Sequence, residues 1–345
     1  MHWPSRRASL QIVLVVVLAG CVGVPEAPLA PSAAAVADLP AAPPALVSGF
    51  HRVADVERVR DAIVAAAGPV GGAFSIGESV QGRPILGVRL TAPGDASDRV
   101  RVLVDGGIHG NEVYGIEAAI YLAAFLAENY GRNATVTRVL EEADVRVVLL
   151  LNPDGREAGT RGNSRGVDMN RNFDVDFGNP SPLCRSQTLS PALPYYAGPR
   201  PLSEPETASL ATLMEEFRPQ IYLSHHTGRH GLIRPWSACD PPHPMPASDD
   251  ALFEHIESWT RANTPYQNTG TAEETAQRLF PPGAASGSSS DWCYLTYHCV
   301  ALTLEVTEHY GEQSDDPLQW SKEVLPINLH LLENARAYAQ WRIPA

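Results

Sequence analysis

The stretch RVLVDGGIHGNEVYGIE, residues 101–117, decides the fold. It begins as an apolar strand, turns at a pair of glycines and continues as the start of a helix. A strand that leads into a helix is the repeating unit of sheets covered by helices. Two polar residues, His109 and Glu112, follow the carboxyl end of this strand, which is where open α/β sheets place their ligand sites. The stretch therefore predicts a fold class and the position of a site.

His109 and Glu112 carry side-chain types that bind zinc, which takes imidazole nitrogen and carboxylate oxygen. A catalytic zinc typically keeps three protein ligands, so a third must come from elsewhere. The same His-x-x-Glu spacing recurs at His309 and Glu312, in a polar loop, and at His330 and Glu333, in an amphipathic C-terminal pattern. A polar loop and a terminal helix are better explained by solvated positions, so we expect the metal at the first pair, which follows a buried-looking strand.

Helix-like and strand-like patterns alternate along most of the chain. Helices are expected at 54–67, 112–128, 204–217, 251–261 and at the C-terminus, and strands at 73–78, 85–91, 100–104, 145–151, 221–224 and 300–306. This alternation predicts a single α/β domain, with a mixed, mostly parallel sheet and helices on both faces. The segment 152–202 lacks such a pattern, and loops of that length usually carry function.

Residues 1–20 resemble a bacterial lipoprotein signal peptide. Arg6 and Arg7 precede an apolar run at 10–18, and LAGC follows at 18–21. The run is too short to span a membrane. We expect cleavage before Cys21, export, and a lipid anchor on Cys21 that holds the protein to a bacterial membrane, with the outer membrane favoured. A plain membrane anchor or an incidental apolar stretch is the alternative to a cleaved signal peptide. Export by the Sec route and export by the twin-arginine route both stay open.

The rest of the chain divides into a tether and a domain. Residues 21–46 are rich in alanine and proline and nearly uncharged, which predicts an extended tether. Residues 47–345 form the expected catalytic domain, long enough to bury about 75% of its unfolded surface. The net charge of −13 becomes −15 if Arg6 and Arg7 leave with the leader, and such a surface disfavours nucleic acid. We expect a monomer.

Four cysteines follow Cys21, namely Cys184, Cys239, Cys293 and Cys299. In an exported protein they predict two disulfides with three possible pairings, and buried free thiols are an equal alternative.

An ordered set of motifs runs from about residue 50 to residue 338. They are IGESVQGRPI at 76–85, GIHGNE at 107–112, NPDG at 152–155, GVDMNRNF at 166–173, YAGPRPLSEPET at 196–207, SHHT at 224–227 and LTLE at 302–305. In this order they resemble the zinc metallocarboxypeptidases of the carboxypeptidase A type. The resemblance implies the fold of that family, one Zn²⁺ per chain, and hydrolysis of the C-terminal bond of peptides with a free C-terminal carboxylate.

The resemblance also implies the zinc ligands His109, Glu112 and His226. His225 and His226 are adjacent at a strand end and must point to opposite faces of the sheet, so alternation alone leaves the third ligand open. Aligning Arg-Pro-Trp at 234–236 with the Tyr-Pro-aromatic stretch of the family places the ligand on His226. His225 is then expected to pack behind the strand.

Four further residues match catalytic or substrate-binding positions of the family. Glu305 falls on the general base, which takes a proton from the zinc-activated water and passes it to the leaving amine. Arg161 falls on the arginine that polarises the scissile carbonyl, and Asn170 and Arg171 fall on the pair that binds the terminal carboxylate. A solvated loop arginine is an alternative for Arg161, and simple turn chemistry is the alternative for Asn170 and Arg171.

One family position is not matched. The family has a tyrosine eight residues before the Asp-Trp that corresponds to 291–292, and Gly283 stands there. The assisting hydroxyl is therefore expected to be absent or to come from elsewhere. The candidates are Tyr195, Tyr196 and Tyr266. The uncharged Ser290, just before Asp291, argues against a preference for C-terminal Lys or Arg.

Three other functions compete with this interpretation. The Gly-x-Ser-x-Gly pattern at 162–166 is typical of serine hydrolases, but it lacks a preceding strand and a following helix. A zinc deacylase of N-acyl amino acids could use the same fold, although Asn170, Arg171 and the long loops favour peptides. A non-catalytic outer-membrane binding lipoprotein would be expected to have lost Glu305 or a zinc ligand. Cell-wall peptides, nutrient peptides and proteins all stay open as substrates.

Overall fold

The structure is a computed structural model that describes residues 49–179, 187–276, 285–313 and 316–341. The expected signal peptide at 1–20, the lipidation site Cys21 and the tether at 21–46 lie outside these residues, as do Cys184 and Gly283. Within the described ranges, no helix combines the length and the apolar character needed to cross a membrane.

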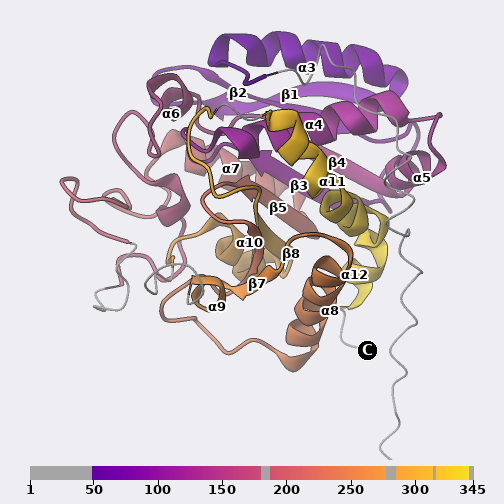
Figure 1. The fold of residues 1–345 in the computed structure, drawn as a ribbon. Coiled ribbons are helices and arrows are strands. Elements are labelled where there is room, and N and C mark those ends of the chain that lie inside the picture. The colour runs from indigo at the N-terminus through magenta and orange to yellow at the C-terminus, as the bar shows by residue number, and fades with distance from the viewer. Residues whose placement is uncertain (1–48, 180–186, 277–284, 314–315, 342–345) are drawn as a thin grey trace, which may run out of the picture. The chain divides into compact units, whose positions relative to one another are not determined.

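One eight-stranded sheet forms the centre of the described chain (Figure 1). Its strands are β1 Gly71–Glu78, β2 Pro84–Leu90, β3 Val100–Gly106, β4 Ala143–Val148, β5 Ile221–His226, β6 Gly231–Arg234, β7 Asn268–Thr271 and β8 Val300–Glu305. Their order is β1-β2-β4-β3-β5-β8-β6-β7. The neighbours β4, β3, β5 and β8 run parallel, as do β6 and β7, and the other three pairings are antiparallel. The expected mixed sheet is confirmed.

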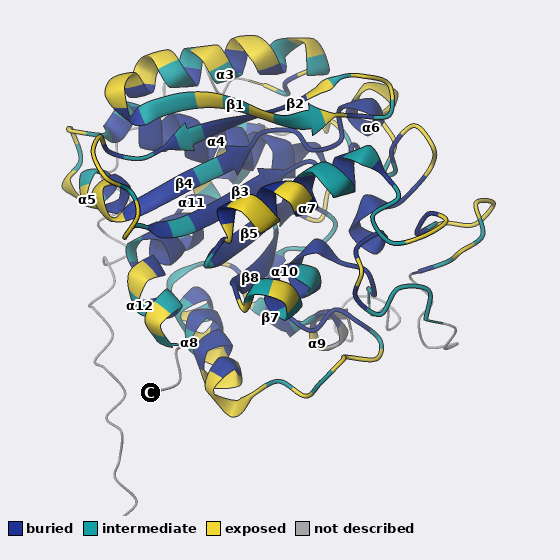
Figure 2. Cartoon of the chain, turned by 180° about the vertical axis from the view of Figure 1, so that it is seen from behind, coloured by how far each residue is buried: buried dark blue, intermediate teal, exposed yellow. Residues whose placement is uncertain are grey.

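Helices cover both faces of this sheet, as the two opposite views in Figures 1 and 2 show. They are α3 Val53–Ala67, α4 Val113–Asn129, α5 Ala134–Glu142, α6 Pro153–Ala158, α7 Pro205–Phe217, α8 Ala247–Asn263, α9 Ala272–Ala276, α10 Ser289–Tyr297, α11 Pro317–Glu333 and α12 Ala335–Trp341. Helices α4 and α11 pack together on one face, and α7 and α10 lie on the other. Helix α4 is apolar nearly all round because it lies between the sheet, α3 and α11.

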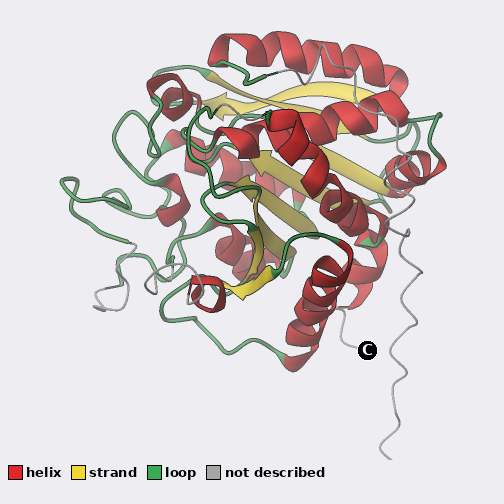
Figure 3. Cartoon of the chain, viewed as in Figure 1, coloured by secondary structure: helices red, strands yellow, loops and turns green. Residues whose placement is uncertain are grey.

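The central strands are apolar runs because both of their faces are covered. Strand β3 has one residue that is not fully buried, Arg101, and all six residues of β5 are buried. From β3 the chain crosses to β4 on one side and later returns to β5 on the other. Connections that diverge in this way leave a crevice at the carboxyl ends of the strands. The long loops gather at one end of the sheet in Figure 3.

Several elements differ from the expected ones. The strand expected at 145–151 is β4, which begins at Ala143 and ends at Val148. Strands β6 and β7 and helices α5, α6, α9 and α10 were not expected, because pieces of four to nine residues carry little periodic signal. Cys293 and Cys299 form a disulfide with 6.0 Å between their Cα atoms, and Cys239 is also disulfide-bonded, which excludes free thiols for these three residues.

Candidate metal and active site

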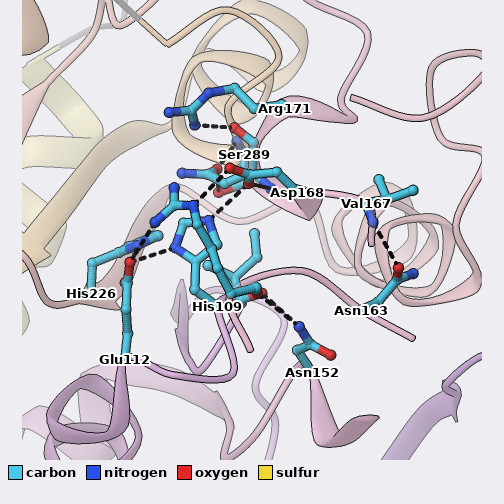
Figure 4. A network of polar contacts seen from close by, with 12 residues as sticks. His109, Glu112, Asn152, Asn163, Val167, Asp168, Arg171, His226 and Ser289 are labelled. Atoms are coloured by element: carbon cyan, nitrogen blue, oxygen red, sulfur yellow. Dashed lines mark hydrogen bonds and ion pairs between the residues drawn. The ribbon is translucent and has the colours of Figure 1, made fainter. Parts of the chain in front are cut away.

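Three side chains with metal-binding atoms converge at the carboxyl ends of β3 and β5 (Figure 4). Nδ1 of His109 lies 2.8 Å from Oε1 of Glu112, and Nδ1 of His226 lies 2.9 Å from Oε2 of Glu112. One ligand atom from each residue lies within 4.8 Å of the others, and all three residues are buried. Among the described residues, His109 Nδ1 has no hydrogen-bond partner of acceptable geometry, as expected of a lone pair that faces a metal position. Two imidazoles and one carboxylate are a donor set that fits zinc.

Local structure holds Glu112 as a carboxylate. Gly107 directly follows β3 and has a φ of 72°, a conformation that L side chains rarely adopt. Glu112 is the N-cap residue of α4, where the positive end of the helix dipole stabilises negative charge. Thr227 N donates to Glu112 Oε2 at 3.0 Å. Burial alone would raise the pKa of Glu112, but the neighbouring His109 and His226 outweigh burial and hold it well below its usual range.

Asp168 is a further site residue, and its motif position alone does not reveal its role. Its Oδ1 lies 2.9 Å from His109 Nε2, and both side chains are buried. Burial would raise the pKa of Asp168, but Arg161 and His109 outweigh it and keep the pKa well below the usual range. The carboxylate therefore accepts the Nε2 proton and leaves Nδ1 as the free lone pair of His109. The available signal was the place of Asp168 two residues before Asn170 in the GVDMNRNF motif.

Arg161 joins the metal-binding cluster to Asp168. Its Nε donates to Asp168 Oδ2 and its Nη1 donates to Glu112 Oε1, both at 2.8 Å. Burial would lower the pKa of Arg161, but the carboxylates of Asp168 and Glu112 raise it, so the guanidinium stays charged. The side chain is 28% exposed, and a guanidinium has five N–H groups, so donors remain for a substrate. Arg161 is therefore hydrogen-bonded to two carboxylates of the site rather than surrounded by solvent alone.

Asn170 and Arg171 lie in a short 3-10 turn, Met169–Arg171, beside the cluster. The side-chain oxygen of Asn170 accepts from the main-chain nitrogen of Ser289 at 2.9 Å and from the Ser289 hydroxyl at 3.2 Å. This leaves the amide NH₂ of Asn170 as the donor end. Arg171 is buried, and its Nη1 donates to the carbonyl of Asn170 at 2.8 Å. A guanidinium and an amide side by side can bind a carboxylate.

Glu305 ends β8 directly beside the third metal-binding residue. In the parallel pairing of β5 with β8, Glu305 is the Cα partner of His226. Its Oε2 is buried and has no hydrogen-bond partner among the described residues. Burial raises the pKa of Glu305, and the negative charge of Glu112 adds to the effect. A carboxylate with an open acceptor and a raised pKa is suited to proton transfer.

The two adjacent histidines point to opposite faces of the sheet. His226 lies with His109 and Glu112, whereas Nε2 of His225 lies 3.0 Å from Oδ1 of Asn328 on α11. Burial lowers the pKa of His225 to about 4, so this ring is neutral. The structure therefore groups His226 with the first two metal-binding residues and places His225 behind the strand.

Two tyrosines lie beside the site. Tyr195 places its ring 5.5 Å from the guanidinium carbons of both Arg161 and Arg171. Tyr310, in the loop after β8, was not among the residues considered from the sequence. Tyr266 is buried, and its hydroxyl donates to a main-chain carbonyl at 2.7 Å, so it is not available to a substrate.

The serine-hydrolase pattern has no catalytic geometry. The Ser164 hydroxyl donates to Asp154 Oδ2 at 3.0 Å, and the segment 160–166 is a turn with no preceding strand. Asp154 is itself fixed by bonds from Ser79 and from the main chain of Gln81. Ser164 is therefore part of a structural network.

Comparisons with known proteins point to one family. A family model described as zinc carboxypeptidase matches residues 61–313. Carboxypeptidase A2 of Rattus norvegicus is 25% identical over 296 residues, which cover 80% of this chain and 66% of the relative. Carboxypeptidase D of Rattus norvegicus is 30% identical over 309 residues, which cover 75% of this chain and 21% of the relative. The chain thus spans less than two thirds of the length of these curated relatives.

Solved structures agree in fold. Thrombin activatable fibrinolysis inhibitor matches with a TM-score of 0.67 at 18% identity, covering 84% of this chain and 75% of that one. Carboxypeptidase A from Helicoverpa armigera matches with a TM-score of 0.65 at 19% identity, covering 84% and 74%. Such low identities establish likeness of fold alone. Since the family model extends over most of the described domain, this chain belongs to the zinc carboxypeptidase family.

Proposed function

We propose that this chain is a zinc-dependent metallocarboxypeptidase that hydrolyses the C-terminal peptide bond of peptides. One Zn²⁺ would be held by His109, Glu112 and His226. The observation that carries the proposal is the placement of a buried cluster of two imidazoles and a carboxylate beside two arginines. The cluster suits a metal, and the arginines suit a substrate with a carbonyl and a carboxylate.

Each remaining side chain has a role that its surroundings support. Zinc, when bound, supplies a Lewis acid and lowers the pKa of water. Glu305 accepts the proton of the attacking water and gives it to the departing amine, using Oε2, which has no hydrogen-bond partner in the described part of the chain. Arg161, held by Asp168 and Glu112, donates to the scissile carbonyl oxygen as negative charge develops there.

Asn170 and Arg171 would make the enzyme an exopeptidase. A carboxylate that accepts from both is fixed in position, so the bond presented to Glu305 is the last one of the peptide. Ser289 contributes by fixing the orientation of the Asn170 amide. The partner is therefore a peptide with a free C-terminal carboxylate.

The test compares peptide pairs that differ only in a free or an amidated C-terminus. Wild type should remove one residue at a time from the free peptides and cut the amidated copies far more slowly. Arg171→Ala should remove most of that difference, because the site then lacks the guanidinium that binds the terminal carboxylate. Arg165→Ala is the matched control: that arginine is exposed and pairs with Glu204 nearby, so discrimination should persist. Equal rates on both peptides in wild type, or internal cuts read by mass spectrometry, would overturn the exopeptidase assignment.

Location is a separate proposal that rests on the sequence alone. We propose that the mature chain begins at Cys21, is lipid-anchored there to a bacterial membrane after export, and acts as a monomer. Palmitate labelling in the native host should require Cys21, and Cys21→Ala should move the protein from membrane to soluble fractions. Membrane association that persists without Cys21 would show that the apolar run at 10–18 is the anchor.

A further inference from the structure

Two exposed aromatic side chains stand beside the site. Among the described residues, large apolar side chains are exposed at four positions, Leu189, Leu193, Tyr195 and Tyr310. Tyr195 is 41% and Tyr310 is 47% exposed. A tyrosine ring has few rotatable bonds, so it offers a large contact area at a low entropic cost. Rings left in solvent at the edge of a site are therefore suited to contact a ligand.

Tyr195 belongs to the arginine end of the site. Its ring lies 5.5 Å from the guanidinium carbons of Arg161 and Arg171. Its segment is fastened to the same turn, because Asp168 N donates to the carbonyl of Tyr196 at 2.7 Å. The ring thus borders the position at which Arg171 would bind the terminal carboxylate of a peptide.

Tyr310 belongs to the metal end of the site. The main chain next to it is tied to the ligand motif, because Gly311 N donates to the carbonyl of Asn111 at 2.8 Å. Asn111 lies between His109 and Glu112 in the sequence. A second hydrogen bond holds the loop two residues after Tyr310, where Arg156 Nη2 donates to Glu312 Oε1 at 2.8 Å. Both bonds hold the Tyr310 backbone in place while its ring remains exposed.

Gly228 makes room for the Tyr310 hydroxyl. A Cβ built at Gly228 would lie 1.9 Å from that oxygen, and the φ of Gly228 is +125°. Gly228 follows His226 by two residues, so the hydroxyl lies just beyond the carboxyl end of β5. Partial burial raises the pKa of Tyr310 to about 12, with the charges of Glu112 and Glu305 adding to the effect, which agrees with this position.

We propose that Tyr195 and Tyr310 are specificity-determining residues that contact different parts of the peptide. Tyr195 packs on the residue that is released, and Tyr310 packs on the residue that contributes the scissile carbonyl. The assignment rests on the proposed function, because Asn170 and Arg171 define the released end. Since the two tyrosines come from separate loops, each fastened on its own, their effects on specificity are separable.

The test uses two series of N-blocked dipeptides and measures kcat and KM for each. The first series keeps the released residue constant and varies the acyl-side residue from glycine to leucine and phenylalanine. The second keeps the acyl-side residue as glycine and varies the released residue. Tyr310→Ala should raise KM by roughly ten- to 100-fold for substrates with a large acyl-side residue. It should leave kcat, and the KM of the substrate with glycine on the acyl side, nearly unchanged. Tyr195→Ala should show the same pattern in the second series only.

Several variants separate contact from structure. Tyr310→Phe keeps the ring and should keep the acyl-side preference. Leu193→Ala, on the Tyr195 loop, and Tyr297→Phe, whose hydroxyl bonds Glu215 away from the site, should leave both series unchanged. Zinc content should be the same in all variants.

The two failures are distinguishable. This assignment is wrong, and the proposed function stands, if wild type cleaves the dipeptides but Tyr310→Ala lowers activity on all substrates equally. The same holds if Tyr310→Ala raises KM in the second series instead of the first. If wild type neither binds nor cleaves any peptide with a free C-terminus, the proposed function and this inference fall together.

Discussion

The pairs His109–Glu112 and His330–Glu333 have the same spacing, and both histidines are buried, yet their surroundings differ. His109 lies between two carboxylates, with Glu112 at 2.8 Å and Asp168 at 2.9 Å. The ring of His330 instead stacks on Trp259, with 3.7 Å between centroids and 5° between planes. The first pair starts a helix at a strand end, and the second lies within α11.

The protonation of His330 follows from its neighbours. The two nitrogens of His330 lie 2.6 Å from the Tyr338 hydroxyl and 3.2 Å from Asn334 Nδ2. Burial lowers the pKa of His330 to about 3, so its ring is neutral and structural. Glu333 faces away, toward Arg138 at 3.3 Å. Spacing therefore gives only proximity along the chain, and partners that come from other elements decide whether a histidine can bind a metal.

The largest expected effect contrasts the histidines directly. His109→Ala and His226→Ala each remove one of three proposed ligands, so purified protein should lose its zinc and its peptidase activity. His225→Ala should keep the metal, because that ring faces α11. Metal analysis of the three variants checks this. Zinc retained by His226→Ala and lost by His225→Ala would reverse the assignment of the third ligand.

The second effect separates proton transfer from metal binding. Glu305→Gln preserves shape but cannot accept a proton, so kcat should fall by about 10²–10⁴-fold. Zinc content should stay unchanged, because Glu305 lies outside the three-residue cluster. Steady-state kinetics with parallel metal analysis provide the measurement. Full activity in Glu305→Gln would remove this residue from the mechanism.

The third effect tests what Asp168 does for His109. Asp168→Asn can still cap the turn but no longer holds the Nε2 proton with a charge, so zinc affinity should fall by about 10–100-fold. Asp144→Asn is the control: Asp144 is also a buried carboxylate, and its partner is Arg89 on β2. Competition with a chelator measures both affinities. Equal affinities in the two variants would make Asp168 structural only.

The smallest effect concerns the structural histidine and appears as a pH dependence of stability. The folded-state pKa of His330, about 3, lies below its unfolded value of about 6.5, so the unfolded state binds more protons between these values. Stability is therefore lost as pH falls below about 6.5. Between pH 7 and pH 5 the His330 contribution is about 2 kcal/mol.

His330→Phe keeps the stack on Trp259 and removes this titration. The unfolding free energy of wild type relative to the variant should drop by that amount over the same pH interval, as measured by urea denaturation. A constant difference across the interval would mean that His330 titrates alike in both states. Zinc content should not change.

Much of the fold could be predicted because its signals are local. The apolar runs of β3 and β8 and the amphipathic pattern of α3 reflect burial on one or both faces, which the residue spacing records. The α/β class and the sheet type follow from their alternation. Strand β6 and helix α10 could not be predicted, because four or nine residues do not complete enough periods to distinguish them from loops.

The residues of the site also divide into those that local sequence signals predict and those that they do not. His109, Glu112 and the motif around Asn170 could be named from the sequence, since motif order is a property of the chain. The bond from Asp168 to His109 spans 59 residues, and Tyr310 reaches the site through a loop fastened to Asn111. No local pattern encodes such contacts.

The sequence by itself determined the long periodic elements and the polar residues that follow the strands, because burial imposes its period on neighbouring positions. Tertiary structure decided the rest. His225 and His226 are chemically identical neighbours, and they differ because Asn328 of α11 lies behind one face of β5 while Glu112 lies at the other. Which side of a strand meets a helix and which meets a carboxylate is set by packing between distant segments, and a single chain position does not carry that information.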